Sequence, residues 1–446
     1  MYKYVEDNYE GMLKDLKDLV KHNSVNSDDA EPFGSENRAV LEEAIRIMDE
    51  KGFRTENVDY YACYGEIGQG EETIGLVAHL DIVPAGDGWD SDPFTVTQKG
   101  DRLYGRGVSD DKGAAVASMY AMKYLKDTNY PLKKKVRLIL GCNEETGSLC
   151  IKHYVEKYGS VDMGFTPDGS FPGIYAEKGM ISGVLRGKSS KILAIKGGEA
   201  RNIVCKKVTA KISAGSFDEK KLEAFFKENR IRYELEKKED CLLTVYGVAA
   251  HAASPDLGVN AINWLFEGLY NADINDPYVS FFHRYIGNTL HGELMGFEEL
   301  KDEATDTSVN IGMIDIEDGM INATVDMRFP IESNVKKCLA LLDKVRDGDN
   351  AFVYQGGIEP IYFPQDSPMI KAMLKAYQDV TGDTESKMLA IGGGTYAKSI
   401  KNIIAFGCGF EKDQDNIHNA NESMAIENFK KQVLIYIEAI KNLNEV

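Results

Sequence analysis

The chain has 446 residues, of which 43% are hydrophobic, so it is long enough for two domains that each bury a core. Its 71 acidic and 52 basic residues give a formal net charge of −19, which excludes a broad nucleic-acid surface, because such a surface requires clustered Lys and Arg. No segment approaches the roughly 18 consecutive apolar residues of a membrane span, so we expect no membrane partner.

The cysteine pattern and the amino-terminal residues both favour the cytoplasm. The seven cysteines are scattered and form no C-x-x-C pair, which is typical of reduced thiols. The first residues, MYKYVEDNYEGMLKDL, are charged and lack the apolar segment of a secretory signal. We therefore expect a cytoplasmic protein.

Helical and strand-like segments alternate in the first part of the chain. Apolar periodicity predicts helices at 8–21, 37–51, 114–125 and 151–158. Strands are expected at 73–80, 134–142 and 162–169. This order predicts an α/β fold with a mostly parallel sheet between helices.

The pattern changes after about residue 183. A strand and a helix at 205–227 are followed by the same order at 320–345, with a strand at 241–248 and a helix at 259–270 between them. We interpret this region as an α+β domain of two related halves. A helix at 367–382 and a buried strand at 402–408 then return to the first pattern. The predicted domains are 1–182 and 362–446, which together form one catalytic α/β domain, and 183–361, which is inserted into it.

Acidic side chains gather where the predicted strands end. His79 and Asp81 close one strand, Glu144 and Glu145 follow the next, and Asp168 follows the third. Asp110 and Asp111 lie in a glycine-rich turn before a helix. Taken singly, each has a plain explanation, since an Asp can cap a helix, a Glu pair can form a solvated turn and a lone His is seldom a ligand.

Taken together, these residues point to bound metal. Ligand sites of parallel sheets lie beyond the carboxyl ends of the strands, which would bring this set to one edge. Crowded carboxylates repel one another unless cations compensate. A mixed His and carboxylate set suits Zn²⁺, with Mn²⁺ or Co²⁺ as alternatives, and two metals about 3.5–4 Å apart are a common hydrolytic arrangement. A second histidine is then expected, and His418 in IHNANE supplies it.

Seven motifs occur in order along the chain: HLDIVPAGDGWDSDPF, YGRGVSDDKG, NEETGS, TPDGSFP, HAASPDLGVNA, IGGGTYA and IHNANE. Together they resemble the dinuclear zinc metallopeptidase family of aminoacylase, carboxypeptidase G and succinyl-diaminopimelate desuccinylase, and most closely its PepV-type dipeptidases. The resemblance implies a phosphorylase/hydrolase-like zinc-exopeptidase domain with an inserted, doubled ferredoxin-like lid. It also implies two bound divalent metal ions, most often Zn²⁺, and hydrolysis of dipeptides.

The resemblance assigns a role to each acidic residue of the set except Asp111. Asp110 would bridge the two metals, with His79 and Asp168 on one and Glu145 and His418 on the other. Glu144 would be the general base that takes a proton from water. Asp81 would hold the second nitrogen of His79, as carboxylates beside metal-binding histidines do.

The same resemblance extends to the inserted domain, which would act as a lid. His251 would stabilise the oxyanion that develops on the substrate, and Arg328 would bind the terminal carboxylate of the substrate. Asn202 would join them, and the GGGTYA turn would offer Gly393, Gly394 and Thr395 to the same carboxylate. Because the doubled lid could imitate the partner of dimeric relatives, we expect a monomer.

Two other functions remain open from the sequence. One is an amidohydrolase of the same family that acts on N-acyl amino acids, a deacylase or desuccinylase. The other is a binding protein that kept the metal site and the fold without catalysis. Because Glu144 and every ligand are present, the sequence favours an enzyme over a binding protein. The resemblance to the PepV-type dipeptidases implies dipeptides with a free amino terminus as its substrates.

Overall fold

The structure is a computed structural model that describes residues 1–300, 302, 305–410 and 416–446. The chain divides into two units: Met1–Ala176, Tyr362–Leu389 and Gly394–Val446 form the first, and Glu177–Ile361 with Ala390–Gly393 form the second. The sequence placed the first boundary after residue 182. The second unit begins earlier, because β9 (Gly179–Gly187) pairs along its length with a strand of that unit.

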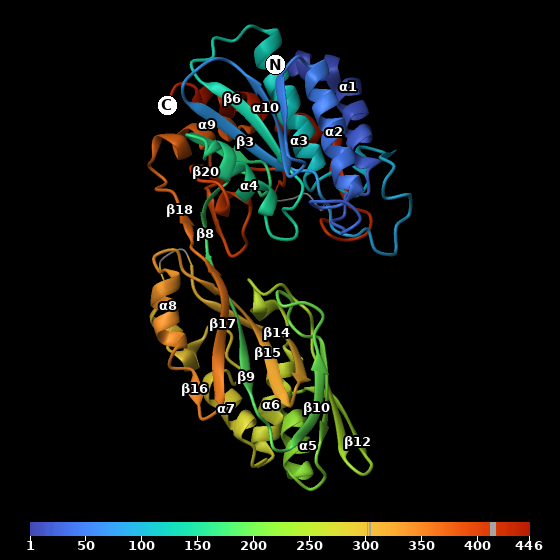
Figure 1. The fold of residues 1–446 in the computed structure, drawn as a ribbon, viewed down its shortest axis with the longest axis vertical. Coiled ribbons are helices and arrows are strands. Elements are labelled where there is room, and N and C mark those ends of the chain that lie inside the picture. The colour runs from blue at the N-terminus through green and yellow to red at the C-terminus, as the bar shows by residue number, and fades with distance from the viewer. Residues whose placement is uncertain (301, 303–304, 411–415) are drawn as a thin grey trace. The chain divides into compact units, whose positions relative to one another are not determined.

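A nine-stranded sheet runs through the first unit, and its central strands are parallel (Figure 1). β3 pairs in parallel with β6 on one side and β7 on the other, and β20 continues the parallel pairing beside β7. The strands are β1 (Arg54–Val58), β2 (Ala62–Ile67), β3 (Thr73–His79), β6 (Lys135–Gly141), β7 (Met163–Thr166), β8 (Ile174–Glu177), β18 (Ile361–Tyr362), β19 (Leu389–Ile391) and β20 (Ile403–Ala405). The pairing confirms the predicted α/β fold, whereas the antiparallel edge strands β1 and β2 were not predicted.

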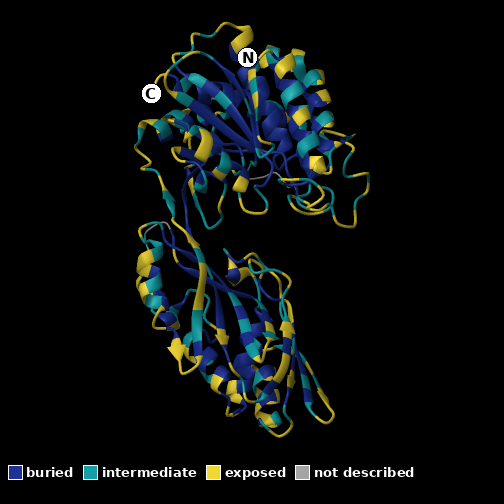
Figure 2. Cartoon of the chain, in the orientation of Figure 1, coloured by how far each residue is buried: buried dark blue, intermediate teal, exposed yellow. Residues whose placement is uncertain are grey.

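Helix α3 supports the centre of this sheet. Residues 112–122 of α3 are all buried, because the segment from Gly113 to Met122 carries no charged side chain and packs on β3 and β6 as well as on α1 and α10. Figure 2 shows the same burial along the strands. The helices of this unit are α1 (Tyr2–Val20), α2 (Ser35–Glu50), α3 (Lys112–Asp127), α4 (Leu149–Tyr158), α9 (Pro368–Thr381), α10 (Ile426–Leu443) and the short η4 (Tyr396–Lys398).

A second, three-stranded sheet joins distant parts of the first unit. β5 (Arg102–Tyr104) pairs with β4 (Thr97–Lys99) on one side and with β21 (Ser423–Ala425) on the other. β5 precedes the turn that carries Asp110, and β21 follows the segment that carries His418. This small sheet therefore brings the two segments together, and no signal in the sequence predicted it.

The second unit contains one nine-stranded antiparallel sheet, in the order β12-β13-β11-β10-β14-β15-β9-β17-β16. Its strands, apart from β9, are β10 (Ile192–Gly197), β11 (Lys207–Ile212), β12 (Arg232–Lys237), β13 (Cys241–Tyr246), β14 (Ser308–Glu317), β15 (Met320–Phe329), β16 (Arg346–Asp347) and β17 (Asn350–Ile358). Its helices are α5 (Glu219–Glu228), α6 (Ala261–Asn271), α7 (Pro277–Tyr285) and α8 (Val335–Leu342), with short turns η1 (Pro255–Leu257), η2 (Glu293–Met295) and η3 (Phe297–Glu299). The two halves of the sheet meet where Gly197 of β10 pairs with Ile314 of β14.

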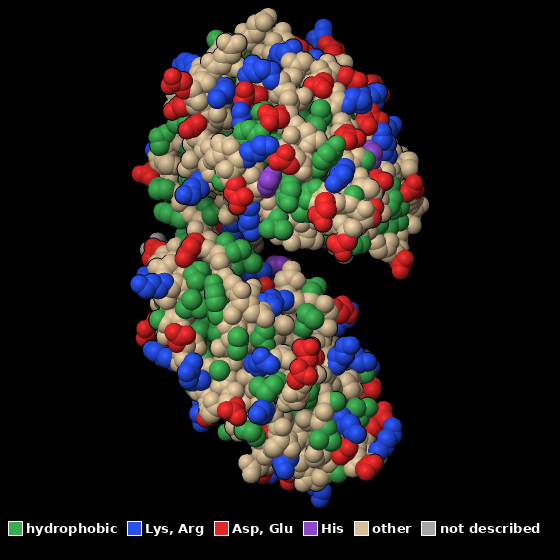
Figure 3. All heavy atoms as spheres, viewed as in Figure 1, with side chains coloured by type: hydrophobic (Ala, Val, Ile, Leu, Met, Phe, Trp, Pro, Cys, Tyr) green, Lys and Arg blue, Asp and Glu red, His purple; other side chains and the backbone are tan. Residues whose placement is uncertain are grey.

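The surface and the helices bear on the partners that the sequence predicts. Acidic and basic side chains are interspersed on the visible face of each unit (Figure 3). Within the described ranges, no helix combines the length and the apolar character needed to cross a bilayer.

The contact between β3 and β7 generates a prediction about stability. A Cβ atom on Gly164 would lie 1.9 Å from the carbonyl oxygen of Gly75, its partner in β3. Gly164→Ala is therefore expected to lower the free energy of unfolding by about 3 kcal/mol, since overpacking costs about 1–3 kcal/mol and backbone cannot move aside easily. Urea denaturation followed by circular dichroism measures the change. Gly356→Ala in β17 is the control, because its Cβ would meet nothing within 4 Å; equal midpoints for the two variants would contradict the prediction.

Candidate metal centre

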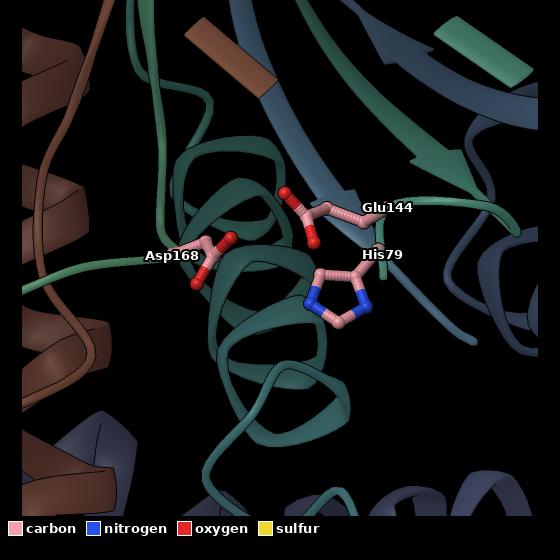
Figure 4. A group of neighbouring side chains, drawn as sticks. All are labelled: His79, Glu144 and Asp168. Atoms are coloured by element: carbon pink, nitrogen blue, oxygen red, sulfur yellow. The ribbon is translucent and has the colours of Figure 1, made fainter. Parts of the chain in front are cut away.

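Three acidic or imidazole side chains converge where three parallel strands end (Figure 4). His79 is the last residue of β3, Glu144 follows β6, and Asp168 follows β7. A ligand atom from each lies within 4.8 Å of the others. These three side chains lie close together because β3, β6 and β7 are paired in parallel and therefore end at the same edge of the sheet.

The Asp110 carboxylate lies between two histidines, one on each of its oxygens. Its Oδ1 is 2.9 Å from Nε2 of His79, and its Oδ2 is 2.9 Å from Nε2 of His418. Nε2 of His418 is also 3.1 Å from Oε1 of Glu145. His79, Asp110 and Glu145 form a second group whose ligand atoms lie within 4.8 Å of one another. The structure thus gathers all five predicted ligands and Glu144 at one place.

The protonation of these groups reflects the crowding of carboxylates. Burial alone would lower the pKa of His79, but hydrogen bonds to Asp110 and Asp81 raise the pKa well above its usual range. Hydrogen bonds to Asp110 and Glu145 raise the pKa of His418 to about 10. Burial, followed by the nearby Asp168, raises the pKa of Glu144 well above its usual range. The carboxylates therefore favour positive charge at both histidines.

This donor set fits divalent metal ions. Two imidazole nitrogens and several carboxylates within ligand distance of one another are the groups that bind Zn²⁺, Mn²⁺ or Co²⁺. A histidine binds metal through an unprotonated ring nitrogen, so metal ions would take the place of protons on these groups. The charge requirement of the carboxylates is then met by ions instead of by imidazolium groups.

Asp81 contacts His79 differently from the prediction. Nδ1 of His79 lies 3.0 Å from the backbone carbonyl oxygen of Asp81 and 3.6 Å from its carboxylate Oδ1. The carboxylate instead accepts the backbone N–H of Glu144 at 3.0 Å and that of Glu145 at 3.1 Å. Because these half-buried N–H groups need acceptors, Asp81 also holds the turn that carries the two glutamates. Its carbonyl and its carboxylate both lie near Nδ1 of His79, and the carbonyl is the nearer of the two.

In the second unit, Asn202 and His251 lie on adjacent segments. His251 forms an antiparallel bridge with Ile203, and the N–H of Ala252 donates to the carbonyl oxygen of Asn202 at 2.9 Å. The N–H of Ala253 donates to Nδ1 of His251 at 3.2 Å. Since Nδ1 accepts, the neutral imidazole carries its proton on Nε2.

Arg328 already has a carboxylate partner. Its Nε and Nη2 donate to the two oxygens of Asp326 at 2.6 and 3.0 Å, and its Nη1 donates to the carbonyl oxygen of Gly392 at 3.0 Å. The side chain is only 5% exposed. Arg328 thus ties the glycine-rich turn to β15, a contact that the sequence did not predict.

The glycine-rich turn is shared between the units. Gly392 and Gly393 belong to the second unit, whereas Gly394 and Thr395 belong to the first. The Thr395 hydroxyl accepts the N–H of Ala397 at 3.2 Å and so begins the short helix η4. Binding of a substrate carboxylate by this turn stays a prediction.

Residues 75–442 match the profile of Peptidase family M20/M25/M40. The chain belongs to this family of peptidases. A Staphylococcus haemolyticus protein named "Putative dipeptidase SH1171" is 31% identical over 466 residues, with 99% of each chain covered. "Putative dipeptidase YtjP" of Bacillus subtilis is also 31% identical, with 97% of each chain covered. Human carnosine dipeptidase 1 has a similar fold, with a TM-score of 0.63 at 17% identity, covering 100% of this chain and 98% of the human one.

Membership of the M20/M25/M40 family makes the chain a metal-dependent hydrolase, in agreement with the sequence-based prediction. Some buried charged residues of this peptidase received no role from the sequence, although they lie inside motifs quoted above. Among them are Arg106 in YGRGVSDDKG and Glu422 in IHNANE. Both side chains are buried, and burial would have marked them as important. A sequence alone does not show which charged side chains are buried.

The contacts of Asp81 lead to a prediction for this M20 peptidase. Asp81→Asn is expected to weaken metal binding by about 10- to 100-fold, as loss of a residue that hydrogen-bonds to metal ligands typically does. The reason is that the amide has one acceptor oxygen for the two backbone N–H groups that the carboxylate accepts. Competition with a chelating dye measures the affinity. Asp92→Asn serves as control, since Asp92 caps a turn by accepting the N–H of Phe94 at 3.0 Å. Wild-type affinity in the Asp81 variant would show that the turn needs no such support.

Proposed function

We propose that this M20 peptidase is a dipeptidase that hydrolyses the amide bond of dipeptides with a free amino terminus, using two divalent metal ions. The observation that carries the proposal is the Asp110 carboxylate between His79 and His418. A carboxylate with one imidazole at each oxygen is arranged as a bridging ligand would be. The relatives of similar length that are named as dipeptidases favour this substrate class.

In the proposed site, Asp110 is shared, His79 and Asp168 complete one metal site, and Glu145 and His418 complete the other. Zn²⁺ is the expected ion, with Mn²⁺ or Co²⁺ as alternatives. When bound, such ions polarise a carbonyl group and lower the pKa of water. The protein contributes the spacing, which the ends of β3, β6 and β7 set.

Glu144 would act as the general base. Its carboxylate takes a proton from the attacking water as the water oxygen adds to the carbonyl carbon of the substrate. The same proton then passes to the amide nitrogen as the C–N bond breaks, which releases a free acid and a free amine. The Asp81 carboxylate orients Glu144 for these transfers through the backbone N–H of the turn.

The second unit would act as the lid of the proposed enzyme. His251 carries its proton on Nε2, so its imidazole is a donor suited to the oxyanion that develops on the substrate carbonyl. Asn202, on the segment beside it, would assist. Arg328 with Gly393, Gly394 and Thr395 would bind the terminal carboxylate of the dipeptide.

We further propose that the enzyme is a monomer of the cytoplasm. The two half-sheets of the second unit are joined edge to edge within one chain, between β10 and β14. The edge strand β12, RYELEK, bears mostly charged side chains, and the opposite edge strand β16 has only two residues; both features oppose pairing with a second chain. All seven cysteines are free and buried, as is usual in a reducing compartment.

Metal-stripped protein tests the reaction directly. Restoring Zn²⁺, Mn²⁺ or Co²⁺ is expected to restore cleavage of free dipeptides, measured as release of amino acids over a panel of sequences. N-acetyl and N-succinyl amino acids are assayed in parallel. Cleavage of the acylated compounds alone would make the protein an amidohydrolase of the acylase type. Metal binding without turnover of either class would make it a binding protein.

Replacement of Glu144 separates a base from a ligand. Glu144→Gln is expected to lower kcat by about 10²- to 10⁴-fold, the usual contribution of a general base, while two metal ions remain bound. Elemental analysis of the purified variant gives the metal content. Because the Glu144 carboxylate lies within 4.8 Å of ligand atoms of His79 and Asp168, loss of one ion would instead identify Glu144 as a ligand.

Replacement of Arg328 tests recognition of the substrate carboxylate. The wild type is expected to cleave a dipeptide at least about tenfold better than its C-terminal amide, and Arg328→Lys to reduce this ratio, because ammonium cannot bind a carboxylate in bidentate fashion. The ratio of kcat/KM for the two substrates is measured. Arg186→Lys, at an exposed position of β9, is the control. An unchanged ratio would leave Arg328 only the role of holding Gly392.

A further inference from the structure

Glu422 is fully buried and accepts hydrogen bonds from the turn that carries Asp110. Its Oε1 accepts the backbone N–H groups of Ser109 at 2.9 Å, Gly107 at 3.0 Å and Asp110 at 3.1 Å. Its backbone carbonyl also accepts the N–H of Gly105 at 3.1 Å. The Glu422 side chain thus binds residues 107, 109 and 110 of the turn, and its backbone binds residue 105.

Arg106 neutralises this buried carboxylate. Its Nη1 donates to Oε2 of Glu422 at 2.7 Å, and both side chains are 1% exposed. Its Nη2 reaches the carbonyl oxygens of Pro84 and Ala85 at 3.5 and 3.4 Å, and its guanidinium lies 5.3 Å from the centre of the Trp89 ring. Arg106 therefore links the same turn to the loop that follows His79 and Asp81.

Neighbouring contacts connect the three segments further. The side chain of Asn421 accepts the N–H of Asp90 at 2.9 Å and donates to the carbonyl oxygen of Gly88 at 3.3 Å. β21 begins at Ser423 and pairs with β5, directly before the turn. The loop after β3, the turn of Asp110 and the segment of His418 consequently meet around one buried ion pair.

We propose that Glu422, paired with Arg106, is a positioning residue that keeps the Asp110 carboxylate between His79 and His418. The proposal rests on the proposed function for the identity of the metal ligands. Glu422 touches none of the predicted ligand side chains; it acts through the backbone of the turn, whose last residue is Asp110 itself. Because His418 lies on the same segment as Glu422, one side chain sets the distance between two ligands of the same site.

A purely stabilising ion pair would be built differently. Burying two charges costs several kcal/mol per ion, so a buried pair is seldom a gain in stability over apolar residues. Here one carboxylate oxygen accepts three backbone N–H groups of a single turn, those of Gly107, Ser109 and Asp110, which fixes the direction of that turn. Residues that hold metal ligands in place commonly influence metal affinity, by about 10- to 100-fold per substitution.

The test compares two buried ion pairs of the same unit. Glu422→Gln keeps the shape of the side chain, but removes the charge and turns an NH₂ group toward N–H groups or toward Arg106. Asp15→Asn removes the carboxylate that pairs with Lys51, where both side chains are 6% exposed and Tyr120 donates to Asp15 at 3.0 Å. Zn²⁺ affinity is measured by dye competition, and the thermal midpoint of the metal-free protein is measured in parallel.

We expect Glu422→Gln to bind Zn²⁺ about 10- to 100-fold more weakly than the wild type, and Asp15→Asn to bind it with wild-type affinity although its midpoint falls. Raising free Zn²⁺ should restore kcat in the Glu422 variant, which it would not do if a reacting group had been lost. A Glu422 variant with a lower midpoint and wild-type Zn²⁺ affinity would overturn the proposal.

Variants of Arg106 and assays of the wild type distinguish the remaining outcomes. If Glu422→Gln is not recovered folded, Arg106→Lys and Arg106→Met replace it: the lysine, which keeps the charge, should retain more Zn²⁺ affinity than the methionine, and equal affinities would overturn the proposal. Weakened Zn²⁺ binding in a protein whose wild type cleaves no dipeptide would support the positioning role while refuting the proposed function. A wild type that binds no metal ion would refute both.

Discussion

Repulsion among carboxylates at the ends of β3, β6 and β7 is the constraint around which the first unit is organised. Glu144, Glu145, Asp110 and Asp168 occupy one small region, where like charges repel one another unless cations compensate. The contacts of Asp110 with His79 and His418 raise the pKa of both histidines, and divalent ions would balance the carboxylates more strongly. The surrounding hydrogen bonds are arranged to hold the acidic turns against this repulsion.

The sequence predicted the part of this arrangement that depends on strand order. Alternation of strands and helices implies parallel pairing, and parallel pairing places His79, Glu144 and Asp168 at one edge. The supporting contacts could not be predicted in the same way. Glu422 and Arg106 are 316 positions apart, and the small sheet that joins their segments has strands of only three residues, too short to show a pattern.

Asp81 and Arg328 show two different limits of sequence-based assignment. At Asp81 the predicted carboxylate does lie 3.6 Å from Nδ1 of His79, but the backbone carbonyl of the same residue is nearer, at 3.0 Å, and the sequence could not show this. At Arg328 the partner was visible in the sequence. Asp326 lies two positions earlier in the same strand, so the two side chains share a face of β15. The alternation in VDMRF therefore contained the ion pair.

The position of β20 has a consequence for synthesis of the chain. This strand lies between β7 and β8 in the sheet, yet Asn402, just before it, contacts Val161 across 241 positions of sequence. While the ribosome makes the second unit, the edge of β7 has no partner strand. The sheet of the first unit is complete only when about the last tenth of the chain is being made. The nascent chain consequently exposes the edge of β7 to association until β20 has been made.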